Sequence, residues 1–128
     1  MRFLLPPAFL LAVTAPAAAQ APCPLAKAGN ALQRVVVGAK ATDRTKAAAK
    51  ALADHLGRVT GGRFVLIDGD GTTGLAVGRA ADFPALKLAD RFAPNEVTRR
   101  EEYVLHTHAD GAWLVGATDL AVEHAVWD

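Results

Sequence analysis

The 128-residue sequence contains no serine and only one cysteine, Cys23. The lack of serine excludes hydrolysis by a serine nucleophile, and no histidine is placed as a catalytic partner of the cysteine. A single cysteine also excludes an internal disulfide framework. Proline precedes Cys23 where a lipoprotein signal needs a small residue. We therefore interpret Cys23 as a flexible N-terminal thiol, although pairing with a second chain stays open.

The sequence also has no large excess of positive or negative charge. The sequence holds 14 Lys and Arg against 13 Asp and Glu, and Arg2 belongs to an N-terminal segment that we expect to be removed. A balanced chain has no long-range field that attracts polyanions. We therefore expect no nucleic-acid partner and no attraction to anionic membranes.

Residues 1–21 are typical of an export signal. An apolar run covers residues 3–13, but Pro6 and Pro7 interrupt it, and it is shorter than the roughly 20 residues that span a bilayer. The small residues in the A-x-A spacing that signal peptidase accepts are Ala17, Ala19 and Ala21. We expect the remainder to be periplasmic or extracellular, without a membrane anchor. It divides into a linker, 22–32, and one domain, 33–128.

The first half of this domain predicts a strand followed by a long helix. The β-branched run in "LQRVVVG" ends at Gly38, as a buried strand would. The helix is predicted to begin after a cap at Thr42 or Asp43 and to end at Gly61-Gly62. The residues expected on its buried face are Ala48, Leu52, Leu56 and Val59.

The following segments predict further strands. The runs "RFVLI" and "LAVG" flank the turn "DGDGTTG" and indicate two strands, with a hairpin between them left open. Residues 80–98 predict a loop with one helical turn at Leu86–Phe92. The runs "EEYVLHTH" and "AWLVGA" flank "ADG" and predict a hairpin, with a helix after Thr118. Because hairpins rather than crossovers are expected to join most strands, we predict an α+β fold, a mixed β-sheet with two main helices packed on one face.

The last predicted helix has a clear start and no clear end. The residues at helical spacing, which predict its buried face, are Leu120, Ala121, His124 and Trp127. No glycine or basic residue closes the last turn, and Asp128 adds negative charge at the negative end of the helix dipole. We therefore expect the polypeptide to continue beyond Asp128.

Two histidines form the most visible candidate for a metal site. His106 and His108 project from the same face of a predicted strand. Either Asp110 or His124 is the candidate third ligand. Zinc needs at least three protein ligands and a supporting shell of hydrogen bonds, which one H-x-H does not supply. The turn "DGDGTTG" lacks both the glutamate of a calcium loop and the lysine step of a phosphate loop. We predict no metal and no cofactor.

No two Asp or Glu residues are spaced in the sequence like the catalytic carboxylate pair of a glycosidase. Such a pair stands about 5–10 Å apart across a cleft, whereas Glu101 and Glu102 point to opposite faces of a strand. Asp119 and Glu123 share a helix face, but acids in a first helical turn usually complement the dipole. We therefore predict no catalytic residue in this chain.

Aromatic side chains suggest a different function, the binding of glycan. Tyr103, Trp113 and Trp127 are able to stack on sugar rings, but tryptophans on a hairpin and an apolar helix face are more typical of a core. We expect both tryptophans in the core. The candidates for ligand contact are therefore Tyr103, His106 and His108 on the predicted hairpin.

Four stretches carry a resemblance to a known family: "ADHLGRVTGGRFVL", "GLAVGR", "REEYVLHT" and "WLVGATDLAVEHAVWD". Here residues 33–128 resemble the N-terminal accessory domain of bacterial α-glucuronidases and the related second domain of β-N-acetylhexosaminidases. In that family a helix ends in a Thr-Gly step, matched by Thr60-Gly61, and a strand pair leads into a glycine and a helix, matched by 113–127. The resemblance implies a mixed sheet with helices on one side, no catalytic residue, and packing against a (β/α)8 barrel that holds the catalytic carboxylates.

These observations give three hypotheses. The first is a non-catalytic accessory domain of an exported carbohydrate-active glycoside hydrolase, with a catalytic barrel as its intramolecular partner. The alternative is an independent periplasmic module that binds glycan or metal through the predicted hairpin. The third is a small enzyme that uses Asp119 and Glu123.

Overall fold

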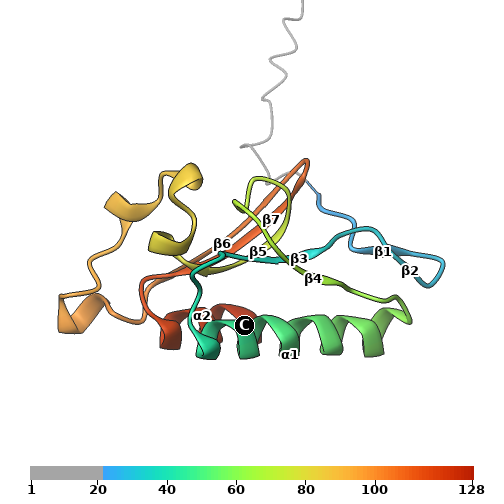
Figure 1. Cartoon of the computed structure of the whole chain (residues 1–128), viewed down its shortest axis with the longest axis horizontal. Helices are drawn as coiled ribbons and strands as arrows, with labels where there is room; N and C mark the ends of the chain where they lie inside the picture. Colours follow the sequence, from blue (N-terminus) through green and yellow to red (C-terminus); the bar gives the residue numbers. More distant parts are fainter. Residues whose placement is uncertain (1–21) are drawn as a thin grey trace, which may run out of the picture.

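The computed structural model describes residues 22–128, whose centre is one five-stranded sheet. Its strands lie in the order β4-β3-β5-β7-β6. They are β3 (Val35–Val37), β4 (Leu66–Asp68), β5 (Gly74–Arg79), β6 (Tyr103–His108) and β7 (Gly111–Gly116). Only β6 and β7 pair antiparallel in this sheet. Helices α1 (Asp43–Thr60) and α2 (Asp119–Trp127) both lie on one face (Figure 1), so the predicted α+β class with a mixed sheet is confirmed.

Helix α1 has the ends that its sequence predicts. The Thr42 side chain accepts a hydrogen bond from the backbone N–H of Thr45 at 3.2 Å, and Gly61 ends the helix with a φ of 77°. The buried residues of the helix are Thr45, Ala48, Ala49 and Ala53. The prediction for Val59 is wrong: its side chain is 69% exposed, because it lies at the margin of the buried stripe in the last turn.

Strands β4 and β5 do not form a hairpin. Both pair with β3 in parallel, one on each side, so the hairpin considered for these two runs is wrong. Because β4 has three residues, the chain needs to return only a short distance before β5 begins. The expectation that hairpins join most strands is also wrong, since α1 is a crossover between the parallel strands β3 and β4.

The predicted hairpin of β6 and β7 and the helix that follows are present. Tyr103 pairs with Gly116, and His108 pairs with Gly111 next to the turn. Thr118 caps α2, as predicted, by accepting a hydrogen bond from the backbone N–H of Ala121 at 3.3 Å. A Cβ on Gly116 would lie 2.7 Å from the backbone nitrogen of Val122, so a side chain there would keep α2 off the sheet.

The buried face of α2 differs from the predicted one. The residues that α2 buries are Ala121, Val122 and Ala125. His124 is exposed, and Trp127 is 65% exposed, so the expectation of a core Trp127 is wrong. Seven of the nine helix residues are apolar or histidine, and therefore several faces of α2 could satisfy a helical apolar pattern. Because α2 packs closely on the sheet, it buries the face that carries the small residues Ala121 and Ala125.

The opposite face of the sheet is covered by an irregular segment. This segment, yellow and orange in Figure 1, contains four 3₁₀ turns at Ala80–Asp82, Pro84–Leu86, Ala89–Arg91 and Val97–Arg99. The single helical turn predicted at Leu86–Phe92 is replaced by the second and third of these turns. Phe83 and Leu88 are buried against sheet residues of this face, Val36, Ala76 and Val115.

The segment predicted as a linker carries a small two-stranded sheet. Strands β1 (Ala26–Lys27) and β2 (Asn30–Ala31) pair antiparallel, and Cys23 and Leu25 pack against the core on the helix side. The predicted export signal, residues 1–21, lies outside the described residues. Within 22–128 no helix has the length and apolar character needed to cross a bilayer.

Candidate functional site

Strand β6 separates the three side chains predicted to contact a ligand. Successive residues of a strand point to opposite faces, so Tyr103 lies on the helix side, whereas His106 and His108 lie on the other side. The Tyr103 hydroxyl donates a hydrogen bond to Asp128 Oδ2 at 2.6 Å, which raises the pKa of Tyr103. The two histidines therefore have to be considered without Tyr103.

His106 and His108 form an aromatic cluster with Trp113 of β7. Trp113 is the cross-strand neighbour of His106, and their ring centroids lie 4.8 Å apart. The His108 ring lies 5.7 Å from the Trp113 ring and 6.4 Å from the His106 ring. All three residues are half-buried. We call this group the His-Trp cluster; it occupies the helix-free face of the hairpin.

Two ring nitrogens of this cluster are buried without a hydrogen-bond partner, His108 Nε2 and Trp113 Nε1. The backbone N–H of Asp110 donates to His108 Nδ1 at 3.2 Å. A neutral His108 therefore carries its proton on Nε2, so both unpaired nitrogens are N–H donors. A buried donor without an acceptor costs about 1–3 kcal/mol, so the two positions require an explanation.

The hydrogen bond to Asp110 also bears on metal binding. A histidine that binds a metal through Nε2 normally donates its Nδ1 proton to an acceptor, whereas His108 Nδ1 is itself the acceptor. The candidate third ligand His124 is exposed on α2, across the sheet from the cluster. Within residues 22–128 no three His, Cys, Asp or Glu side chains are placed to hold a metal ion.

A hollow of about 260 Å³ lies near the turn between β6 and β7, but none of the three rings of the His-Trp cluster lines it. Asp110, whose backbone contacts His108, forms part of its wall. The remaining lining residues are Leu32, Gln33, Arg34, Val36, Ile67, Thr73 and Gly74. Gly74 and Gly111 are paired across β5 and β7, and a Cβ on Gly111 would lie 2.0 Å from the carbonyl oxygen of Gly74. The sheet is therefore bare of side chains between Arg34 and His108.

A second polar cluster lies where α1 and α2 begin. Asp119 Oδ1 accepts hydrogen bonds from the hydroxyls of Thr42 at 2.8 Å and Thr45 at 2.9 Å. Arg79 Nε lies 3.7 Å from the same oxygen, and its Nη2 lies 3.2 Å from Asp82 Oδ1. Asp119 thus joins the N-termini of the two helices. These partners account for the cluster as a structural contact.

Glu123, the other acid on α2, pairs with a base on α1. Arg44 Nη2 donates to Glu123 Oε2 at 2.8 Å, and this hydrogen bond lowers the pKa of Glu123. In the same way Arg99 Nε donates to Glu102 Oε1 at 2.8 Å and lowers the pKa of Glu102. A general acid for glycoside cleavage needs a raised pKa. The pKa values of Glu123 and Glu102 are lowered instead.

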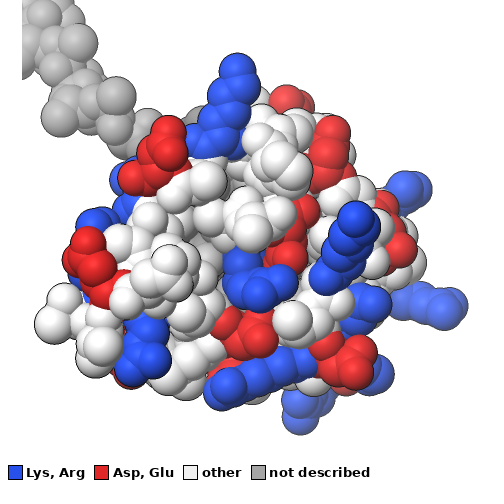
Figure 2. All heavy atoms as spheres, turned by 60° about the vertical axis from the view of Figure 1, so that its left-hand side comes forward, with Lys and Arg blue, Asp and Glu red and all other residues white. Residues whose placement is uncertain are grey.

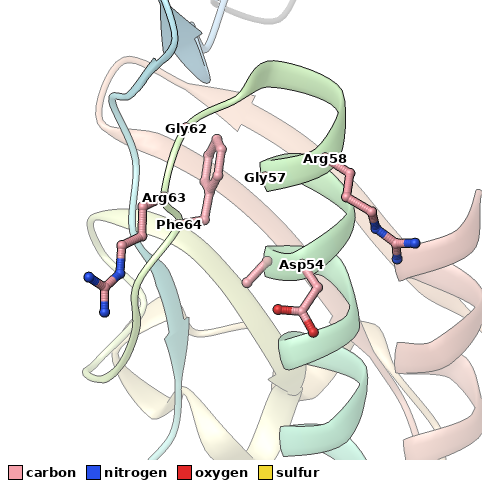
Figure 3. Close-up of a pocket in the computed structure, with 7 residues that line it drawn as sticks. Asp54, Gly57, Arg58, Gly62, Arg63 and Phe64 are labelled. Carbon is pink, nitrogen blue, oxygen red and sulfur yellow. The ribbon is translucent and has the colours of Figure 1, made fainter.

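Two other hollows lie on the helix side of the molecule. The larger, of about 620 Å³, lies between the end of α1 and the chain leading to β4. Figure 3 shows that Arg58 and Arg63 point to opposite sides of this hollow, so no charged groups converge in it. The smaller, of about 210 Å³, has an apolar lining that includes Cys23 and Leu56. Burial raises the pKa of the Cys23 thiol, which lowers its reactivity.

Surface charge does not define a site. In Figure 2 basic and acidic side chains alternate over the face shown, and neither sign forms a continuous patch. This distribution agrees with the balanced composition of 14 Lys and Arg against 13 Asp and Glu.

Several residues in and next to the hollow that Arg34 and Asp110 line did not stand out in the sequence. Arg34 precedes a short apolar run, and Gly74 and Gly111 are typical turn residues, so no local pattern marks them. Only the pairing of β3, β5 and β7 brings them together. Comparison with known proteins gives no match, either among protein-family models or among curated proteins.

Proposed function

We propose that this chain is a non-catalytic accessory domain of an exported glycoside hydrolase with an α-glucuronidase-like or hexosaminidase-like catalytic barrel. The observation that supports it is the mixed sheet with α1 and α2 on one face, which is the arrangement that the sequence resemblance implies. On this proposal the domain contributes a packing surface, and the carboxylates that cleave substrate belong to the barrel.

The state of the carboxylates on α2 favours a non-catalytic role. Asp119 is held by Thr42, Thr45 and Arg79, and Glu123 is held by Arg44. Arg44 engages both carboxylate oxygens of Glu123 and lowers its pKa, whereas a glycosidase acid needs a raised pKa. The chain by itself is therefore expected to hydrolyse neither aryl glycosides nor aryl glucuronides.

An apolar edge of the domain supplies a surface for the barrel. Trp127 on α2 is 65% exposed, and Leu105 on the edge strand β6 is 40% exposed. Leu105 shares its face of β6 with Tyr103, whose hydroxyl bonds to Asp128 beside Trp127. Exposed tryptophan is typical of protein interfaces. We assign this edge to the contact with the barrel.

The native polypeptide tests this proposal. Antibodies raised against the chain should detect, in the exported fraction of the source cells, a polypeptide larger by a barrel of about 250 residues. A deletion strain is the control for antibody specificity. Immunoprecipitated native protein should hydrolyse aryl glycosides or glucuronides, whereas the purified chain should not. A native polypeptide no larger than the chain, or turnover by the chain that Glu123→Gln abolishes, would contradict the proposal.

A further inference from the structure

Strands β3 and β5 are neighbours in the sheet, but the chain leaves them toward opposite faces. After β3 it enters α1 on the helix face and returns as β4. After β5 it enters the irregular segment on the other face (Figure 1), and it returns through β6 and β7 on the far side of β5. The connections therefore change side between β3 and β5. In open sheets with parallel strands, ligands bind outside the carboxyl ends of the strands at such a point.

A hollow of about 490 Å³ lies at this position, and we call it the strand-end hollow. Its walls come from the segments that follow three parallel strands. They include Ala39 and Lys40 after β3, Gly69 and Asp70 after β4, and Ala81 and Asp82 after β5. The volume is within the roughly 300–1,000 Å³ typical of sites for small molecules.

Backbone contacts hold the three strand ends together around the strand-end hollow. The N–H of Gly69 donates a hydrogen bond to the carbonyl oxygen of Val37 at 3.0 Å, which joins the ends of β4 and β3. A Cβ on Gly38 would lie 2.7 Å from the carbonyl oxygen of Asp82, so only glycine allows this approach. The Asp82 side chain is 3% exposed and accepts hydrogen bonds from the backbone and the guanidinium of Arg79. The walls are therefore fixed before a ligand enters.

Two side chains of opposite charge in this hollow are available to a ligand. Lys40 is exposed, and no hydrogen bond or ion pair joins its side chain to another of the described residues 22–128. Asp70 is exposed as well, and its Oδ1 accepts hydrogen bonds from the Thr72 hydroxyl at 2.7 Å and from the Thr72 backbone N–H at 3.0 Å. These bonds orient the carboxylate and lower the pKa of Asp70, which keeps it ionised at neutral pH. The hollow thus presents one cation and one anion that do not pair with each other.

From this geometry we infer that the strand-end hollow is a binding site for a free α-amino acid. The carboxylate of an amino acid pairs with the Lys40 ammonium, and its ammonium group pairs with the Asp70 carboxylate. A ligand with one charge of each sign complements these two groups. The apolar wall residues Ala39, Ala81 and Pro84 leave room for a small aliphatic side chain.

Other ligands fit these groups less well. A phosphate ester carries up to two negative charges, whereas the hollow has a single free cation beside two carboxylates. The N-terminus of α1 does not attract an anion, because Asp43 and Asp119 already lie there. Within residues 22–128 no three side chains are placed to hold a metal ion. A sugar ring finds no aromatic side chain among the residues that line this hollow.

Glycine amides allow a direct test by NMR with an internal control. We would titrate the 15N-labelled chain with L-alanine and follow the amide signal of Gly69 in the wall of the hollow. This signal should shift and saturate. The signal of Gly57, about 20 Å along α1 from the start of the helix, should stay constant. Acetate and methylamine carry one charge each, so either alone should bind more weakly than L-alanine.

Matched variants localise the effect. Lys40→Met removes the cation and Asp70→Asn removes the anion, and each should weaken binding about 3-fold, the value of one exposed ion pair. Lys46→Met and Asp90→Asn make the same changes at exposed positions outside the hollow and should leave affinity unchanged. The spectrum of each variant reports whether the chain is folded, so a loss of binding is not confused with unfolding.

Three results would overturn the inference. They are the absence of a saturable Gly69 shift with L-alanine at tens of millimolar, acetate binding as tightly as L-alanine, and equal losses of affinity in Lys40→Met and Lys46→Met. The inference rests on the strand ends and is independent of the proposed function. Amino-acid binding by a chain whose native form has no barrel would support it while contradicting the accessory role. A barrel-bearing native protein without the Gly69 shift would do the reverse.

Discussion

The two faces of the sheet are covered in different ways. Helices α1 and α2 pack on one face mainly through alanine, and Ala49 and Ala121 have no exposed surface. The irregular segment covers the other face with larger side chains, among them Phe83, which also has no exposed surface. Regular helices approach a sheet closely when their contact residues are small. The backbone of an irregular segment lies farther from the sheet at some points than a helix does. Large side chains are therefore needed to fill the space between this segment and the sheet.

The polar groups of the two faces differ as well. On the helix side, the buried hydroxyl of Thr45 has an acceptor in Asp119. On the helix-free side, two buried N–H groups at the hairpin have no partner. Where helices pack, the polar groups are satisfied within the protein. Among residues 22–128, both side-chain nitrogens that are buried without a partner lie on the face that no helix covers.

The largest effect is expected from removing the aromatic side chain that fills the irregular face. Phe83→Ala should destabilise the chain by about 3–5 kcal/mol, because a buried phenyl group is replaced by a cavity. Phe92→Ala is the matched control: Phe92 is half-buried, so its loss should cost less. Urea denaturation followed by circular dichroism measures both. Equal losses would mean that Phe83 does not hold this face together.

Enlarging a small buried residue of α1 tests how closely this helix packs on the sheet. Ala49→Leu adds volume where α1 contacts the sheet and should destabilise the chain by about 1–3 kcal/mol through overpacking. Val59→Leu enlarges an exposed residue of the same helix and should change stability by less than about 0.5 kcal/mol. A stable Ala49→Leu variant would show that α1 has room to move away from the sheet.

The satisfied polar contact on the helix side should give a smaller effect. Thr45→Val keeps the shape of the side chain and removes its hydrogen bond to Asp119, so stability should fall by about 1 kcal/mol. Thr72→Val removes a similar bond to Asp70 on the surface and should have no measurable effect, because water replaces the lost partner. If both variants behave alike, the link between the helix N-termini does not contribute to folding.

The smallest effect is expected from the surface pair of Arg44 and Glu123. Folding lowers the pKa of Glu123, so the folded state binds the proton less tightly than the unfolded state. The pair should therefore stabilise the chain above the ordinary glutamate pKa of 4.5 and lose this effect as the pH falls through the lowered value. The Tm difference between the unaltered chain and Glu123→Gln, measured from neutral to acidic pH, should vanish in acid. Glu101→Gln is the control, and salt should weaken the effect.

The parts of the fold that the sequence predicts correctly depend on near neighbours in the chain. Thr42 and Gly61 mark the ends of α1, and "ADG" marks the turn between β6 and β7. These signals act over a few residues, through caps and turns. The faces of the helices were predicted less well, since Val59 and Trp127 fit a helical apolar pattern and yet remain exposed.

Local sequence therefore determined the two helices, the strands of the five-stranded sheet and the turn between β6 and β7. Tertiary structure alone decided that β3 lies between β4 and β5, that α2 packs through Ala121 and Ala125, and that Arg34 and Asp110 line one hollow. The reason is distance along the chain. Thr45 and Asp119, for example, are 74 residues apart, and only a packed sheet makes the contact between them. Such contacts depend on the order and direction of strands, which no short stretch of sequence specifies.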